Sequence, residues 1–576
     1  MANNSGAGRA LRRYGPIALV VVIVLGVVLI AGGGGDDDDD QVTAGTGSDV
    51  TAGGDGGDSG LPLTFQEAQE QGTEGDIDWG PNCDTETGRL KVPIHNRFPC
   101  VEPWEDGADN GGATAQGVTA DEITIALYKG QPDPLQQALV EDAGGNTDPN
   151  AVNQTALDYL AMLEQIVETY GRSFNVVTIE ASGGPADATA AAADAQKVID
   201  LKPFAAIGGP AQTPAYWQEL ANAGIVCVGG CSLAEPWDVV EGAAPYLWPT
   251  GLNPNQADTH LAEFLGKQLV GKPAEFAGDP ALQSQERVFG WIQAETETGE
   301  YEERNDAFEE MFAEYGGEIA DRFTYLFVTT STGDEVAPTA IQRMRDAGVT
   351  SIILSTDPFV PKQLTEEAEK QGYRPEWIIG PTVLVDTTFF GRTYQQDQWS
   401  RAFGIGLPTA RQDNELEDSW FVYEWWYGAQ PPVNTQGVIW PGPYRFALGV
   451  HLAGPNLTPE TFKEGLFRYP PEPGGLTYTH QSWGEDIWGR ADYNSSDDAT
   501  VIWYDTDEVG ESETGVEGSG MLRYVEGGKR YLPGEWPTDP IPIFEEDGSV
   551  TVYEELPESE EVEDYPPWPG SPAAGG

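Results

Sequence analysis

The chain alternates short apolar runs with longer segments in which apolar residues recur every three or four positions. The first pattern predicts buried β-strands and the second predicts amphipathic helices. Strands are expected at residues 122–128, 174–181, 225–230, 287–295, 323–328, 351–356 and 376–381. Helices are expected at residues 155–171, 186–201, 255–270, 302–315, 339–348 and 360–372. This alternation predicts an α/β fold of parallel sheets flanked by helices, and the number of units favours two lobes.

One unit in this series has an unusual junction between its strand and its helix. Residues 204–220, FAAIGGPAQTPAYWQEL, break an apolar run at two glycines and continue as an amphipathic helix that starts near Thr213. A helix that starts at the carboxyl edge of a parallel sheet presents unpaired N–H groups and its positive dipole end at that edge. Ligands of such sheets bind there, so the turn is expected to hold a carboxylate or similar group. Thr213 also has a structural interpretation as the helix N-cap.

The composition narrows the range of partners. The 576 residues include 30 Lys and Arg against 94 Asp and Glu, which gives a formal net charge of −64. Such a charge repels nucleic-acid phosphates and anionic lipid headgroups, so nucleic acid is excluded as a partner. We interpret the acidity as a solvated surface rather than as cation-binding sites. The 17 Trp, 22 Tyr and 20 Phe provide enough large side chains to fill hydrophobic cores.

The N-terminus resembles an export signal. Arg9, Arg12 and Arg13 precede an apolar stretch at residues 17–31, so the bulk of the chain is expected outside the cytoplasm. The stretch is intermediate in length between a signal-peptide core and a spanning helix of about 20 residues. We expect residues 1–35 to be an uncleaved membrane anchor, with secretion after cleavage as the alternative. No cysteine directly follows the stretch, which excludes a lipoprotein anchor.

Four cysteines agree with an oxidising compartment and allow three pairings. The simplest hypothesis pairs neighbours in sequence, Cys83 with Cys100 and Cys227 with Cys231. Fully extended, residues 227–231 would hold their end Cα atoms about 13 Å apart, which is too far for a disulfide. The second bond therefore requires a turn at Gly229 and Gly230, which glycine permits.

The regions outside the alternating part differ in composition. Residues 36–60 are rich in Gly and Asp and are expected to be a flexible linker, followed by an N-terminal extension at 61–116. Residues 511–540 are expected to form a Trp-containing C-terminal extension. The acidic, Pro-rich residues 541–576 are expected to be a disordered tail.

Several stretches together resemble a known family. Residues 117–128, 204–230, 287–319, 341–381 and 442–466 are similar, in order and spacing, to type I periplasmic binding proteins, especially the branched-chain amino acid (Leu/Ile/Val)-binding proteins of ABC importers. The resemblance implies two lobes that close by a hinge motion on a small solute in the cleft between them. It places lobe 1 at 117–283 and 405–475, and lobe 2 at 284–404 and 476–510.

The resemblance also indicates which loops would contact the solute. In lobe 1 these loops supply Tyr128, Lys129, Gln131, Pro210, Gln212, Thr213, Cys231, Ser232 and Leu233. In lobe 2 they supply Glu297, Tyr301, Thr356, Asp357 and Asp386. Lys129 is a candidate partner for an anionic group and Asp357 for a cationic group, and both have the alternative interpretation of solvated loop residues. The cysteine at 231 departs from the small or hydroxyl residues of the family and puts a standard amino acid ligand in doubt.

The sequence gives little support for catalysis. It has four histidines and lacks the H-E-x-x-H, G-x-S-x-G and P-loop motifs. The acidic stretch at 492–498 lacks EF-hand spacing, so we expect a turn without a metal, and no cofactor. The preferred function is a monomeric, extracytoplasmic solute-binding protein that serves an ABC permease. The alternatives are a ligand-sensing receptor that works with a partner signalling protein, and a cell-surface structural protein with a vestigial cleft.

Overall fold

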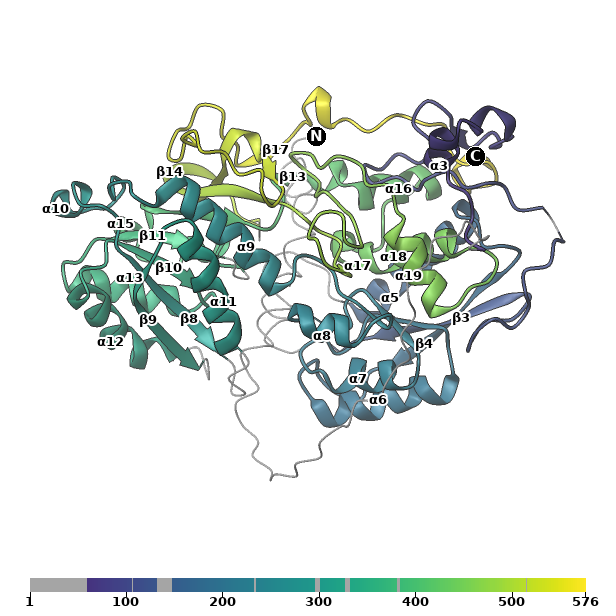
Figure 1. The fold of residues 1–576 in the computed structure, drawn as a ribbon, viewed down its shortest axis with the longest axis horizontal. Coiled ribbons are helices and arrows are strands. Elements are labelled where there is room, and N and C mark those ends of the chain that lie inside the picture. The colour runs from purple at the N-terminus through teal and green to yellow at the C-terminus, as the bar shows by residue number, and fades with distance from the viewer. Residues whose placement is uncertain are drawn as a thin grey trace, which may run out of the picture.

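The chain folds into two α/β lobes that lie side by side (Figure 1). The computed structural model describes residues 60–105, 107–131, 148–232, 235–295, 301–326, 332–380, 384–513 and 515–575. Each lobe is built on a sheet with helices on both of its faces, which confirms the fold class predicted from the sequence.

Lobe 1 contains a five-stranded, all-parallel sheet in the order β4-β3-β5-β6-β7. Its strands are β3 (Glu122–Lys129), β4 (Ser173–Glu180), β5 (Ala205–Ile207), β6 (Val226–Val228) and β7 (Leu247–Trp248). Its helices are α5 (Pro149–Ile166), α6 (Ala188–Leu201), α7 (Ala215–Asn222), α8 (Trp237–Gly242), α16 (Asp418–Tyr427), α17 (Gln436–Ile439), α18 (Pro441–Ala453) and α19 (Pro459–Phe467). In Figure 1, α6 and α7 lie below the sheet, and α5, α18 and α19 lie above it.

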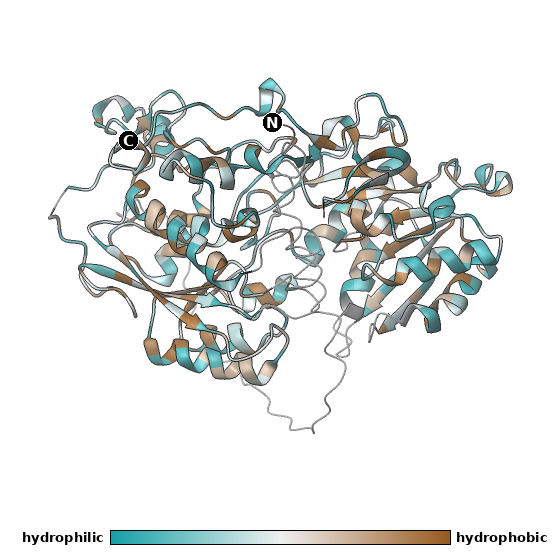
Figure 2. Cartoon of the chain, turned by 180° about the vertical axis from the view of Figure 1, so that it is seen from behind, coloured by the Kyte–Doolittle hydropathy of each residue, from teal (hydrophilic) through white to brown (hydrophobic). Residues whose placement is uncertain are grey.

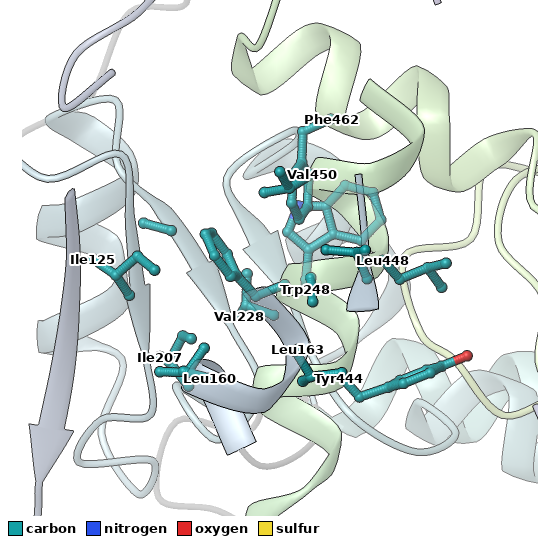
Figure 3. Close-up of a cluster of buried hydrophobic side chains, with 14 of the residues drawn as sticks. Ile125, Leu160, Leu163, Ile207, Val228, Trp248, Tyr444, Leu448, Val450 and Phe462 are labelled. Carbon is teal, nitrogen blue, oxygen red and sulfur yellow. The ribbon is translucent and has the colours of Figure 1, made fainter. Parts of the chain in front are cut away.

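The core of lobe 1 forms where this sheet meets the helices above it. Figure 3 shows side chains from β3, β5, β6 and β7 beside side chains from α5, α18 and α19. The labelled strand residues are Ile125, Ile207, Val228 and Trp248, and the labelled helix residues are Leu160, Leu163, Tyr444, Leu448, Val450 and Phe462. The helices within residues 418–467 follow the first part of lobe 2 in sequence, so the chain returns to complete the core of lobe 1.

Lobe 2 contains a mixed eight-stranded sheet in the order β15-β14-β12-β11-β10-β8-β9, with β16 also paired to β14. Its strands are β8 (Phe289–Glu295), β9 (Ile319–Leu326), β10 (Ser351–Ser355), β11 (Glu376–Ile379), β12 (Ala402–Gly406), β14 (Ala499–Glu511), β15 (Glu517–Tyr524) and β16 (Arg530–Tyr531). Strands β8 to β12 are parallel, and the pairings of β14 are antiparallel.

The helices of lobe 2 cover both faces of this sheet. They are α9 (Pro254–Phe264), α10 (Pro280–Gln283), α11 (Tyr301–Glu314), α12 (Thr332–Asp346), α13 (Val360–Lys370), α14 (Thr388–Gly391) and α15 (Gln396–Trp399). In Figure 1, α12 and α13 lie on one side of the strands, and α9 and α11 lie on the other. Figure 2 shows the strands mainly in the hydrophobic colour and the outer helix surfaces mainly in the hydrophilic one, as buried parallel sheets require.

The lobe boundaries differ from those expected from the sequence. Residues 250–283 were expected in lobe 1, but α9 packs its Leu261 and Phe264 against Phe289 and Trp291 of lobe 2. An amphipathic helix does not indicate which of two sheets it covers, so its pattern could not decide this. Likewise, β15 and β16 belong to the sheet of lobe 2, so residues 517–531 are not a separate extension.

The predicted disorder of the tail is wrong for residues 541–575. Ile541 and Ile543 are buried on lobe 2, and β17 (Val552–Tyr553) pairs with β13 (Arg411–Gln412). Further on, Tyr565 and Trp568 are buried on the side of lobe 1, so the tail spans both lobes along the top of Figure 1. The acidic composition predicted disorder. Composition does not show that the few aromatic and aliphatic residues of the tail are buried against apolar surfaces of the two lobes.

The N-terminal extension packs on lobe 1. It contains α3 (Phe65–Gln71), β1 (Cys83–Asp84) and β2 (Arg89–Leu90), and its Phe98 joins the core of that lobe. Both expected disulfides are present, Cys83 with Cys100 and Cys227 with Cys231. The second closes over Gly229 and Gly230, which have φ of 55° and 73° as the predicted turn requires.

The expected membrane anchor at residues 1–35 lies outside the described residues, as does the expected linker except for its last residue. Within the part of the chain that the structure describes, no helix is long and apolar enough to cross a membrane.

Candidate functional site

The candidate site consists of the carboxyl edges of the two sheets. The strands of one parallel sheet all end at the same edge, where ligands of such folds bind. The chain leaves lobe 1 from the carboxyl end of β7 and enters α9 of lobe 2 within a few residues. It leaves the parallel part of lobe 2 from the carboxyl end of β12, forms the short β13 and then enters α16 of lobe 1. Because these two crossings start at carboxyl ends, we infer that each of these edges lies on the side of its neighbouring lobe.

The edge of lobe 1 is closely packed around the turn that follows β5. A Cβ atom on Gly209 would lie 2.7 Å from Cε1 of Tyr216 and 3.4 Å from Cα of Cys231. Glycine is therefore required here so that the turn, the first residues of α7 and the disulfide loop can meet. The hydroxyl of Tyr216 and that of Ser232 are buried and have no hydrogen-bond partner among the described residues.

The other predicted residues of this turn take more limited roles. Pro210 and Gln212 lie in the loop between β5 and α7. Thr213 precedes that helix, and its hydroxyl accepts a long 3.4 Å hydrogen bond from the N–H of Ala215. The helix therefore begins without a strong side-chain cap, since Pro214 at the N-cap position makes none.

The predicted residues at the end of β3 already have partners inside lobe 1. Lys129 Nζ lies 3.0 Å from Glu180 Oε1 and 2.9 Å from Asn150 Oδ1. The Tyr128 hydroxyl donates to Asp194 Oδ2 at 2.9 Å. Burial, and then this hydrogen bond, raise the pKa of Tyr128, so it stays a neutral donor. Gln131 donates to the carbonyl of Ala181 at 2.7 Å.

In lobe 2, β8 and β10 each have a neutral polar residue at or near the carboxyl end of the strand. Gln293 of β8 pairs in register with Ser355 of β10, and Thr356 follows directly. Both Gln293 and Thr356 are buried, and Gln293 Oε1 and Thr356 Oγ1 have no hydrogen-bond partner in the described part of the chain. Ser355, in contrast, accepts from the Trp291 indole at 3.0 Å.

Asp357 has a structural role in the fold. Its Oδ1 accepts from the N–H groups of Phe359 and Val360 at the start of α13, at 2.8 and 3.1 Å. Its Oδ2 accepts from the Tyr325 hydroxyl at 2.5 Å. Burial raises the pKa of Asp357, whereas these hydrogen bonds oppose that rise. The carboxylate therefore anchors a helix, as acidic residues do at helix N-termini.

Asp386 is buried in the connection between β11 and α14. Burial is the main cause that raises its pKa to about 7, and the charge of Glu513 adds to the rise. Backbone N–H groups, including that of Leu407, oppose it. Leu233 and Glu297 lie outside the described residues, and of Tyr301 the structure describes only that α11 begins there.

Sequence reasoning missed Tyr216 and Gln293. Tyr216 lies on the apolar face of α7. Its position in the sequence pattern is that of an ordinary core aromatic residue, so the pattern did not identify it as a site residue. Gln293 could have been found from the sequence, because it is the one polar side chain in the otherwise apolar run at residues 289–294. A polar side chain in a fully buried strand needs a partner, and that requirement singles it out.

Two hollows in the described surface lie away from these edges. One of about 310 Å³ is lined by Asp279, Arg345 and Tyr373 of lobe 2, among others. The other, of about 550 Å³, lies among His480, Arg530 and Glu560, where the tail meets the connection between the lobes. Neither includes a residue of the strand edges.

Comparison with known proteins gives structural likenesses only. No family model and no curated protein matches the sequence. The chain is similar to a possible leucine/isoleucine/valine-binding protein from Rhodopirellula baltica SH 1, at 10% identity over 67% of this chain and 94% of that one, with a TM-score of 0.44. It is also similar to an ABC transporter substrate-binding protein from Sphaerobacter thermophilus, at 14% identity over 73% and 100% of the chains, with a TM-score of 0.47.

A third similar structure is a solute-binding protein from R. palustris in complex with 4-hydroxybenzoate, at 13% identity over 73% of this chain and 99% of that one, with a TM-score of 0.45. These likenesses agree with the resemblance stated from the sequence. At such identities and TM-scores they assign neither a family nor a ligand to this chain.

Proposed function

We propose that the chain is an extracytoplasmic solute-binding protein that captures a small organic solute between its two lobes and delivers it to an ABC permease. The observation that carries this proposal is that the chain crosses between the lobes from the carboxyl ends of β7 and β12, and that each edge has buried polar atoms without a hydrogen-bond partner among the described residues. A solute that contacts both edges would stabilise the closed arrangement by a hinge motion.

The hinge itself is supported by contacts between the crossing segments. Arg445 of α18 donates to the carbonyl of Trp248 at 3.0 Å and also contacts the carbonyl of Pro249 and the hydroxyl of Ser495. One buried guanidinium thus holds two of the segments that join the lobes. This arrangement suits two rigid lobes that move about a fixed connection.

A ligand panel tests the proposal. The full chain, under oxidising conditions, is screened by thermal shift against amino acids, amides, organic acids and sugars. A ligand at 100 times its Kd stabilises the folded state by about 2.7 kcal/mol, which is a clear shift. Stabilisation by one chemical class supports solute binding. Absence of any shift across the panel would overturn the proposal.

A cell-surface structural protein is the second candidate, and one observation favours it. The tail contacts both lobes, with Ile541 buried on lobe 2 and Trp568 buried near lobe 1. Such a strap restrains the separation of the lobes. If the panel gives no ligand, and removal of the tail strongly destabilises the chain, this second function is the better one.

A further inference from the structure

Four neutral polar atoms at the two strand edges are buried without a hydrogen-bond partner among the described residues. They are Tyr216 Oη and Ser232 Oγ in lobe 1, and Gln293 Oε1 and Thr356 Oγ1 in lobe 2. Their residues are 0%, 2%, 3% and 5% exposed, respectively. A buried polar group without a partner destabilises the folded state, so four of them at two ligand-binding edges need a reason.

Three charged side chains at the same edges, Lys129, Asp194 and Asp357, are engaged within their own lobes. Lys129 is paired with Glu180, and Asp194 with Lys197 at 2.7 Å. Both oxygens of Asp357 accept hydrogen bonds from its own lobe. A carboxylate buried here would therefore find Lys129 already paired with Glu180, and an ammonium group would find both oxygens of Asp357 already occupied by hydrogen bonds from neutral donors.

We propose that the solute is uncharged and that it is recognised through a carboxamide group. This inference rests on the proposed function and names the ligand class of the same site. The four unpartnered atoms are then the polar contacts of the bound solute, and Lys129, Asp194 and Asp357 have structural roles within their lobes.

The hydrogen-bonding capacity of the four groups favours a carboxamide over a carboxylate. The carbonyl oxygen of Gln293 only accepts, so the solute must present an N–H or O–H donor to it. The hydroxyls of Tyr216, Ser232 and Thr356 can donate to a carbonyl oxygen. A primary amide offers both functions on one carbon, whereas a carboxylate offers acceptors only. An ammonium group could donate to Gln293, but it would bring a buried charge.

A matched ligand series tests the inference on the full chain. Isothermal titration compares isovaleramide, isovalerate and leucine, which share a branched apolar skeleton, and then benzamide, benzoate and phenylalanine. We expect one amide to bind at least tenfold more tightly than both of its charged counterparts, which corresponds to about 1.4 kcal/mol. Tighter binding of an acid or an amino acid would overturn the carboxamide inference and leave solute binding intact.

A pair of threonine variants separates recognition from folding. In Thr356→Val, the loss of an unpartnered hydroxyl should maintain or raise the thermal midpoint of the free protein, while amide affinity falls at least tenfold. In the control Thr365→Val, the lost hydroxyl is one that donates to Pro361 O at 2.8 Å within α13. This control should lower the midpoint and leave the affinity unchanged. Unchanged affinity in Thr356→Val would contradict the assignment.

A variant that introduces a negative charge at the site provides an independent test of ligand preference. Gln293→Glu replaces the neutral acceptor with a carboxylate and should shift preference from the amide toward leucine or phenylalanine. If all six compounds fail to bind the wild-type chain, the carboxamide inference is overturned. The broader panel described above then decides separately whether the protein binds solutes at all.

Discussion

The ring of His95 joins the tail to lobe 1, because its Nε2 lies 2.9 Å from the main-chain carbonyl oxygen of Glu560. Its Nδ1 lies 2.7 Å from Asp418 Oδ1 of α16, and the ring stacks on Tyr478 with centroids 4.0 Å apart. Both ring nitrogens therefore face acceptors, and only the protonated imidazolium donates to both. Residues far apart in the sequence are held together by one titratable group.

The first prediction concerns the pH dependence of this junction. Burial acts to lower the pKa of His95, but the charge of Asp418 and its hydrogen bond outweigh burial and raise it overall. Because the folded-state pKa is raised, the stabilisation is fully present below about pH 6.5 and is lost as pH rises through the folded value. In urea unfolding, His95→Gln should lose about 1 to 2 kcal/mol relative to wild type at pH 6 and less at pH 9. A pH-independent difference would contradict this account.

His451 provides a control, because its pKa is shifted in the opposite direction from that of His95. Burial is the main cause that lowers its pKa to about 4, and its Nδ1 accepts from the N–H of Glu168 at 2.9 Å. A depressed histidine pKa destabilises the folded state as pH falls from about 6.5 toward 4, because the unfolded chain binds the proton more tightly. The difference between wild type and His451→Gln should therefore shrink in acid, where that of His95→Gln reaches its maximum.

The second prediction concerns the ordered tail. Trp568 is buried and lies with its ring 6.3 Å from that of Trp425, whose indole donates to the carbonyl of Tyr565 at 2.9 Å. Trp568→Ala should reduce the free energy of unfolding by about 3 kcal/mol, since it removes a large buried side chain. The exposed Glu561→Gln should change it by less than about 0.5 kcal/mol. Equal stability of the two variants would mean that the tail is not packed in solution.

The third prediction compares how much each of the two disulfides stabilises the folded state. Cys83 and Cys100 are 17 residues apart in sequence, and Cys227 and Cys231 are 4 apart. The entropy that a crosslink removes from the unfolded chain grows with loop length, to about 3 kcal/mol for the first bond and about 2 kcal/mol for the second. Paired Cys→Ala variants should follow this order in urea unfolding. The Cys227/Cys231 pair should in addition weaken solute binding, because the loop supports Ser232, and unaltered binding would count against this loop as part of the site.

The fourth prediction concerns Asp386, whose pKa is raised by burial to about 7. A raised carboxyl pKa means that the folded state favours the protonated form, so stability is lost as pH rises from about 4 to 7. Asp386→Asn removes the buried charge and should gain on the order of 3 kcal/mol over wild type at pH 8, compared with little at pH 4. Thermal midpoints measured across this range provide the check. A gain that is larger at pH 4 than at pH 8 would reverse the assigned sign.

Much of the fold could be predicted because it depends on local patterns. Strand 351–356 and helix 360–372 appear close to their predicted limits, as β10 and α13. Both disulfides join neighbours in sequence, and Gly229 and Gly230 have the positive φ that the short loop needs. The lobe to which α9 belongs was not predictable, because its apolar stripe fits either sheet.

The candidate site was only partly predictable. Thr356 and Ser232 were expected from their loops, and the structure buries both without a hydrogen-bond partner in the part of the chain that it describes. Lys129 and Asp357 were expected as charged contacts, but Glu180 and Tyr325 engage them. Their partners come from other strands, so no local pattern could reveal them.

The sequence by itself determined the alternation of strands and helices, the two lobes and the turn at Gly208 and Gly209, and it favoured the pairing of neighbouring cysteines. These features depend on periodicity and on residues that are neighbours along the chain. Only the tertiary structure decided which charges are neutralised, which polar atoms at the strand edges have no partner among the described residues, and that the acidic tail is ordered. The physical reason is that burial and hydrogen bonding depend on residues far apart in sequence, as His95 and Glu560 are.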